Sequence, residues 1–135
     1  MKNRVGTCYT SCRIENPIDR KKSVAVPKIL VDSDAMFTRV NGKTLKKIGL
    51  DQETNCTFIN VSGRETTRTI GYAIIGVGDA ETIDEVVFGE PGDLEILGAR
   101  TLEGMNLRVD PRAKKLVAGG PILAAAQNVA KAVGK

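Results

Sequence analysis

The stretch that decides the fold runs from Lys28 to Val40 and reads KILVDSDAMFTRV. Its first half is apolar enough for a buried strand, and the strand ends in two carboxylates, Asp32 and Asp34, separated by Ser33. Burying a carboxylate costs free energy unless the group is paired or hydrogen-bonded. The stretch is therefore either a surface turn held by local side-chain hydrogen bonds or a site that uses its acids.

The composition limits the class of protein. The chain has 135 residues, of which 41% are hydrophobic, so one domain with one modest core is expected. Aromatic residues make up only 4% and there is no Trp, so the core must be built from Val, Ile, Leu and Ala. No window is long and apolar enough for a membrane span, and the N-terminus lacks the apolar segment of a signal peptide. These features predict a cytoplasmic protein without a membrane partner.

Charge and cysteine content argue against several partners. The net charge is +4, and the cationic clusters are scattered without interleaved aromatic residues, so no nucleic-acid partner is expected. Three Cys and no His are too few ligands for a structural zinc. Cys8 and Cys12 would lie about 13 Å apart on one face of a strand, which is too far for a disulfide. We therefore expect reduced thiols, no metal and no cofactor.

The hydrophobic pattern predicts a mostly β protein. Strands are expected over 5–17 and 23–33, a helix over 41–50, a long hairpin over 53–79, a strand over 81–92, a short strand and helix over 94–110, and a last strand of the same sheet over 112–120. Pro27 indicates an edge or a bend within the second strand, and Gly49 fits a helix C-terminus. The segment after Gly119 predicts a C-terminal helix that begins near Pro121 and either docks on the domain or joins an oligomer contact.

Familiar motifs fail on inspection. NGKT lacks the glycine that a phosphate-binding loop needs, and DSDAMF lacks the later ligand and glycine of a calcium loop. The glycines of GYAIIGVG do not open a helix, so they do not form a dinucleotide fingerprint. A strand that ends in Asp-x-Asp also resembles the first motif of haloacid-dehalogenase-type phosphatases. Those enzymes need a parallel, doubly wound sheet, for which this chain is too short and too rich in β-strand.

Five stretches in a fixed order carry a stronger resemblance: ILVDSDAMFTRV, KTLKKIGL, NVSGRE, VVFGEPGDLEILGARTLEGMNLRVD and RAKKLV. From Val5 to Val117 the layout resembles the retropepsin-like (retroviral-type) aspartic proteases, in particular the small single-domain ones of bacteria. Asp-Ser-Asp stands where that family has Asp-Thr/Ser-Gly. The resemblance implies a mostly β, closed-barrel acid-protease half with one or two short helices over residues 1–118. Residues 119–135 form a helical tail outside it.

The resemblance also implies a site and a partner. Asp32 would meet Asp32 of a second copy across a twofold axis, so the enzyme would be a homodimeric endopeptidase acting on polypeptides without a cofactor. The residues expected to support the active-site loop are Ser33, Asp34, Ala35, Thr38 and Gly98. The residues expected to form a substrate-binding flap are Val61, Ser62, Gly63 and Arg64.

Two departures from the family pattern bear on activity. Asp34 replaces a glycine, and its backbone N–H remains able to bond the Asp32 carboxylate. The added charge is expected to raise a carboxyl pKa, to turn outward or to attract a cation. Arg39 stands where the family usually has an apolar residue, and pairing with Asp34, more easily between subunits, is the compensation we expect. The alternative to an active enzyme is an inactive peptide-binding or dimerisation module silenced by Asp34.

Overall fold

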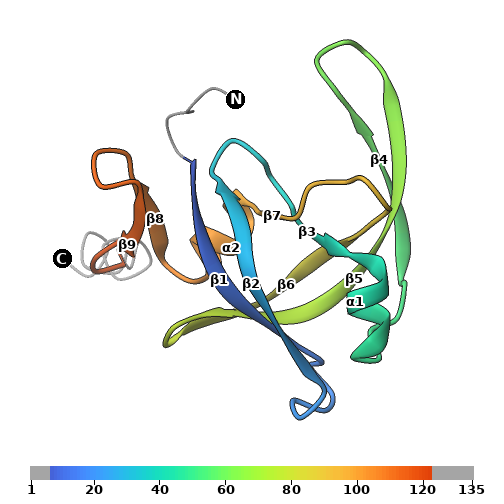
Figure 1. Cartoon of the computed structure of the whole chain (residues 1–135), viewed down its shortest axis with the longest axis horizontal. Coiled ribbons are helices and arrows are strands. Elements are labelled where there is room, and N and C mark those ends of the chain that lie inside the picture. The colour runs from blue at the N-terminus through green and yellow to red at the C-terminus, as the bar shows by residue number, and fades with distance from the viewer. Residues whose placement is uncertain (1–6, 123–135) are drawn as a thin grey trace, which may run out of the picture.

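The computed structural model of the chain describes residues 7–122, and these residues form a mostly β fold, as the sequence predicts (Figure 1). The elements are β1 (Thr7–Glu15), β2 (Ser23–Asp32), β3 (Thr38–Asn41), α1 (Gly42–Lys47), β4 (Thr54–Ile59), β5 (Glu65–Val77), β6 (Ala80–Gly89), β7 (Ile96–Leu97), α2 (Ala99–Gly104), β8 (Leu107–Asp110) and β9 (Lys115–Ala118). None of the helices within this part of the chain is long and apolar enough to cross a membrane.

Seven strands make the main sheet, in the order β1-β2-β7-β3-β6-β5-β4. Consecutive strands pair antiparallel in β1–β2, β4–β5 and β5–β6, whereas β2–β7 and β3–β6 are parallel. The sheet curls strongly, because β1 pairs with β5 as well as with β2. The core therefore lies inside the curl, and β4 is left at one end of the strand order with one edge that no other described strand pairs.

The end of β2 is deeply buried. Its last four residues, from Ile29 to Asp32, are all buried, because β2 lies between β1 and β7. The rest of the core is aliphatic, as the composition predicts, with Phe88 its one buried aromatic ring among the described residues. Apolar burial of this kind contributes about 25 cal/mol for each Å² removed from water, so these strands hold the fold together.

Pro27 lies within β2, an interior strand of the sheet. A β-bulge at this position allows the strand to continue past the proline. The register of β1 on β2 runs from Thr10 opposite Ile29 to Cys12 opposite Val26, so β2 carries one extra residue there. A bulge releases one backbone donor from the ladder, which is why Pro27 is accommodated. The predicted bend is thus confirmed. Cys8 and Cys12 are both buried and free on the inward face of β1.

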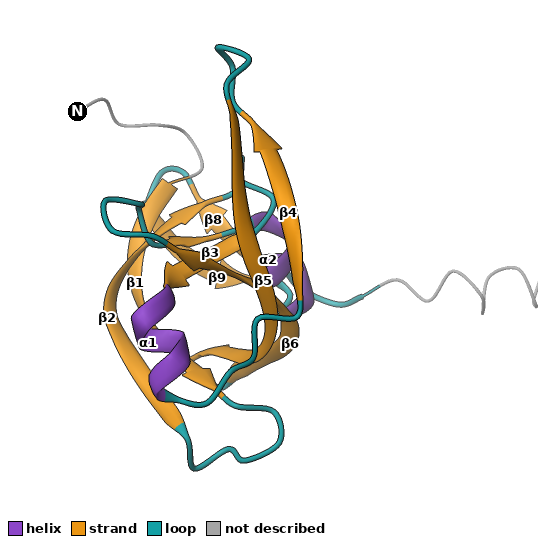
Figure 2. Ribbon diagram, turned by 90° about the vertical axis from the view of Figure 1, so that its right-hand side faces the viewer, coloured by secondary structure: helices purple, strands orange, loops and turns teal. Residues whose placement is uncertain are grey.

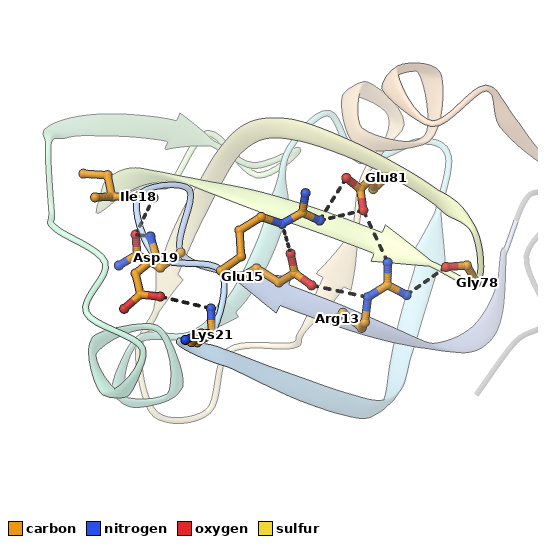
Figure 3. A network of polar contacts seen from close by, with 9 residues as sticks. Arg13, Glu15, Ile18, Asp19, Lys21, Gly78 and Glu81 are labelled. Carbon is orange, nitrogen blue, oxygen red and sulfur yellow. Dashed lines mark hydrogen bonds and ion pairs between the residues drawn. The ribbon is translucent and has the colours of Figure 1, made fainter.

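The two turns at one end of the sheet are joined by charged side chains (Figure 3). Arg20, in the β1–β2 turn, donates to Glu15 at 2.7 Å and to Glu81 of β6 at 2.8 and 2.9 Å. Arg13 reaches the carbonyl of Gly78 at 2.8 Å. The Arg20 and Glu81 side chains are exposed and Glu15 is partly buried, so each pair contributes only a few tenths of a kcal/mol to about 1 kcal/mol.

Two expectations from the sequence differ from the structure, and a third lies mostly outside the described residues. The short strand β3 was not predicted, since its four residues follow the turn after Asp32 without a long apolar run. The last predicted strand, β9, does not join the main sheet but pairs with β8 as a separate two-stranded sheet. Most of the tail predicted as a helix, residues 123–135, lies outside the described residues.

Candidate functional site

The site begins at the point where β2 ends. Asp32 is its last residue, and only 4% of its surface is exposed. The backbone N–H of Asp34 donates to Oδ1 of Asp32 at 3.0 Å, and the N–H of Ala35 donates to the Asp32 carbonyl at 3.1 Å. The hydrogen bond expected from the Asp34 amide is therefore present. The tight turn fixes where that carboxylate lies.

The turn is docked onto the start of α2 by backbone hydrogen bonds. The N–H of Ala99 donates to the Ala35 carbonyl at 2.7 Å, and that of Arg100 donates to the Met36 carbonyl at 3.1 Å. The close approach depends on Gly98, where an added Cβ would lie 2.5 Å from the carbonyl oxygen of Phe37. Gly98 thus packs directly behind the Asp32 turn.

A chain of buried hydroxyls holds the same junction from inside. The Gly98 N–H donates to Oγ1 of Thr38 at 3.0 Å, and this oxygen lies 2.6 Å from Oγ1 of Thr101. Thr101 donates in turn to Oδ2 of Asp84 at 2.9 Å. Because the Thr101 proton is used on Asp84, Thr38 must donate to Thr101. Both threonines are fully buried, so this chain is a structural link between β3, α2 and β6.

The two acids of the Asp-Ser-Asp turn differ in exposure. Asp32 is buried, whereas Ser33 and Asp34 are exposed, so the second carboxylate turns outward. The ion pair expected between Arg39 and Asp34 is not formed within one chain. Instead, Nε of Arg39 donates to the carbonyl of Leu94 at 2.8 Å.

The long hairpin of β4 and β5 extends beyond the rest of the sheet (Figure 2). Asn60 organises its tip, because Oδ1 of Asn60 accepts from the N–H of Ser62, from the Ser62 hydroxyl and from the N–H of Arg64 at 2.7–3.0 Å. Gly63 has φ +84°, a conformation that favours glycine. Val61 projects fully into solvent. Asn60 was not predicted from the sequence as a site residue, although an Asn at the start of a hairpin turn is a recognisable signal.

A hollow of about 430 Å³ lies between the Asp32 turn and the hairpin. It is lined by Ala35, Met36, Phe37, Arg39, Cys56, Thr57, Phe58, Ile59, Val87 and Ile96. Phe37 and Phe58 meet edge to face with ring centroids 5.6 Å apart. The hollow thus joins the turn after Asp32 to strand β4, and none of the four predicted flap-tip residues lines it. We call it the hairpin hollow.

A second hollow of the same volume lies beside α1. Its lining includes Lys43 and Lys46 of α1 together with Asn55, Thr67 and Thr69 of the hairpin, and none of the site residues predicted from the sequence. The lysine side chains are exposed, and most of the residues that line the hollow are of polar type. It is therefore separate from the site around Asp32.

The base of the hairpin is fastened by a two-pronged ion pair. Arg68 of β5 donates through Nε to Oδ2 of Asp93 at 2.7 Å and through Nη2 to Oδ1 at 3.0 Å. The N–H of Glu90 adds a bond to Oδ2 at 2.8 Å. The Arg68 bonds, more than the Glu90 amide, lower the pKa of Asp93 to about 2. Asp93 therefore stays ionised over most of the acidic range.

The cysteines and carboxylates are spread over the described part of the chain. Within residues 7–122, no group of three or more Cys, Asp or Glu side chains is placed to hold a metal ion. Burial raises the pKa of the Cys12 thiol to about 12, with nearby Glu95 adding to the effect, and burial also raises the pKa of Cys8. These two thiols behave as small apolar core groups.

No family model matches this chain, and no curated protein matches it. The site is therefore defined by its own geometry. The turn residues expected from the sequence are brought together, namely Asp32, Ser33, Asp34, Ala35, Thr38 and Gly98. The residues predicted to form a flap, Val61, Ser62, Gly63 and Arg64, lie at the end of the projecting hairpin.

Proposed function

We propose that this protein is a homodimeric aspartic-type endopeptidase with a retropepsin-like closed barrel. The observation that carries the proposal is the buried Asp32 carboxylate. It lies at the end of an interior strand, accepts the Asp34 N–H, and sits in a turn fastened to α2 through Gly98. A surface turn has no need of a buried acid or of such a tightly fixed position.

The chemistry requires two copies of the turn. One chain offers one such strand end, so a two-carboxylate site needs a twofold dimer with Asp32 of each subunit at the axis. Carboxylates about 3 Å apart share a single proton. The ionised one takes a proton from a bound water, which attacks the peptide carbonyl. The protonated one donates to that carbonyl oxygen, and collapse of the intermediate releases an amine and a carboxylic acid.

The hairpin supplies the surface that would hold a peptide. An extended peptide can add to an unpaired strand edge. Among the described strands β4 offers such an edge, and it lines the hairpin hollow together with the turn after Asp32. The tip residues Val61, Ser62, Gly63 and Arg64 would close over the bound peptide as a flap. Closure would exclude water from the dyad and position the scissile bond.

One observation favours a second function. The exposed Asp34 brings two further carboxylates close to the proposed axis, where they compete with substrate and with the dyad. The alternative is therefore an inactive module of the same fold, which binds extended peptides or dimerises without cleaving.

The experiment that tests the proposal is digestion of a mixed library of unstructured peptides between about pH 3 and pH 7, read by mass spectrometry. The wild-type chain is compared with Asp32→Asn and Asp34→Gly. Cleavage by the wild type that disappears in Asp32→Asn supports the dyad. Cleavage only by Asp34→Gly supports the silenced module. If none of the three chains cleaves a peptide, the proposal of an endopeptidase is overturned.

A further inference from the structure

We propose that the hairpin hollow is a side-chain-binding subsite in which Arg39 selects a peptide residue with an acidic side chain, glutamate above all. The inference rests on the proposed function in one respect, that the ligand is a polypeptide. It does not require that the peptide be cleaved.

Arg39 occupies the floor of the hollow. In the register of the main sheet it lies opposite Ile96 of β7 on one side and opposite Val87 of β6 on the other. Directly paired residues project from the same face of a sheet, and Val87 and Ile96 both line the hollow. The floor is thus one cation between two aliphatic side chains.

The donors of Arg39 are only partly used. Its Nε bonds the Leu94 carbonyl, while its two terminal nitrogens have no hydrogen-bond partner among the described residues. The carboxylate near enough to matter is Asp93, and Arg68 already occupies both of its oxygens. Arg39 therefore acts on Asp93 only through space, as the smallest of the effects that lower the pKa of that acid. A half-buried guanidinium with open donors is suited to an incoming carboxylate.

The walls favour a carboxylate on an apolar stem. The rings of Phe37 and Phe58 and the side chains of Met36 and Ile59 line the hollow. Methylene groups of a ligand lose water against these walls, and the low polarity strengthens a charge-assisted bond to Arg39. Glutamate has one more methylene than aspartate, so it covers more of the walls before its carboxylate reaches the floor. A neutral glutamine of the same shape would lack the charge.

The test is binding, measured on the full chain carrying Asp32→Asn so that no peptide is consumed. The probes are fluorescent peptides of one extended, unstructured sequence in which a single central residue is Glu, Gln, Leu or Lys, with each position of the peptide scanned in turn. At the preferred position, near pH 6, we expect Glu to bind at least about tenfold more tightly than Gln.

Two substitutions of Arg39 and one control show whether the preference for Glu depends on Arg39 or only on the charge of the protein. Arg39→Leu should remove the preference for Glu and favour the Leu peptide, whereas Arg39→Lys should keep part of it, because an ammonium retains charge without the planar fork. Arg112→Leu changes the charge equally on the exposed β8–β9 turn and should leave the preference unchanged. Thermal melting of each variant confirms that it is folded.

The outcomes distinguish this inference from the proposed function. Peptide binding without a preference for Glu, or with a preference that survives Arg39→Leu, overturns the subsite and leaves the endopeptidase standing. A preference that depends on Arg39, in a chain that cleaves no peptide before Asp32→Asn is introduced, supports the subsite and overturns the endopeptidase. If no peptide binds at any position, both are overturned.

Discussion

At the scale of single residues, Gly98 shows how closely the Asp32 turn and α2 are fitted. An added methyl group would lie 2.5 Å from the oxygen and 2.6 Å from the carbon of the Phe37 carbonyl, and backbone atoms have little room to move. Gly98→Ala should therefore lower the free energy of unfolding by about 1–3 kcal/mol. Urea denaturation measures this, with the exposed Glu103→Ala of the same helix as a control. Equal stability of the two variants would show that the Asp32 turn and α2 can move apart to accept the added methyl group at little cost in free energy.

The hydroxyl chain behind the turn makes a second prediction at this scale. Thr101→Val keeps the shape of the side chain but leaves Thr38 and Asp84 without their shared partner. A buried polar group that loses its partner costs about 1–3 kcal/mol. Thr57→Val is the matched control, since its hydroxyl pairs with Thr67 on the exposed hairpin. Chemical denaturation should show a larger loss of unfolding free energy for Thr101→Val than for Thr57→Val. Equal losses would contradict the hydrogen-bond chain from Thr38 through Thr101 to Asp84.

Some residues of this site could be predicted from the sequence, and others could not. Asp32 and Gly98 stand out, because an acid after an apolar run and a glycine before a short helix carry local signals. Thr101 carries none. Its partners, Thr38 and Asp84, are 63 and 17 residues away in the chain, and only the parallel pairing of β3 with β6 brings them together. Long-range pairing of this kind has no short sequence pattern.

At the scale of elements, the hairpin depends on the Arg68–Asp93 pair at its base. The folded-state pKa of Asp93, about 2, lies below the value of about 3.9 for an unfolded chain. A lowered pKa means that the stabilisation is complete above about pH 4 and is lost as the pH falls toward 2. Asp93→Asn should therefore cost about 1–2 kcal/mol near neutral pH and progressively less in acid.

Urea unfolding of the wild type and Asp93→Asn at several pH values between about 2 and 6 measures this difference. Asp79→Asn is the control, since Asp79 lies exposed in the β5–β6 turn and makes no ion pair with the described residues. A cost of Asp93→Asn that stays constant down to the lowest pH would show that its charge does not hold the hairpin.

Elements with a strong local signal were predicted well. Gly49 ends α1 with φ +79°, and Gly63 turns the hairpin with φ +84°, as expected of glycines in those places. β3 and the separate β8–β9 sheet were missed or misplaced. Four-residue strands contain too little periodicity to be recognised, and whether a strand joins a sheet depends on partners that the local sequence does not name.

At the scale of the whole molecule, the proposed dyad makes assembly and protonation interdependent. If Asp32 of two copies meets across an axis, the dimer holds one shared proton between two carboxylates. When that proton is lost at higher pH, two negative charges face each other at close range, and their repulsion opposes association. The dimer is then tightest in mild acid and weakens as the pH rises.

The dimer dissociation constant of the wild type should accordingly rise at least about tenfold between about pH 4.5 and pH 7.5. Asp32→Asn removes both charges, so its dissociation constant should change little over the same range. Sedimentation equilibrium measures both, and Asp79→Asn, which leaves the turn intact, should follow the wild type. A chain that is monomeric throughout, or a wild type that responds to pH as Asp32→Asn does, would place Asp32 away from any twofold axis. Its buried carboxylate would then serve the fold rather than a reaction, because a single acid of this kind lacks the partner that hydrolysis requires.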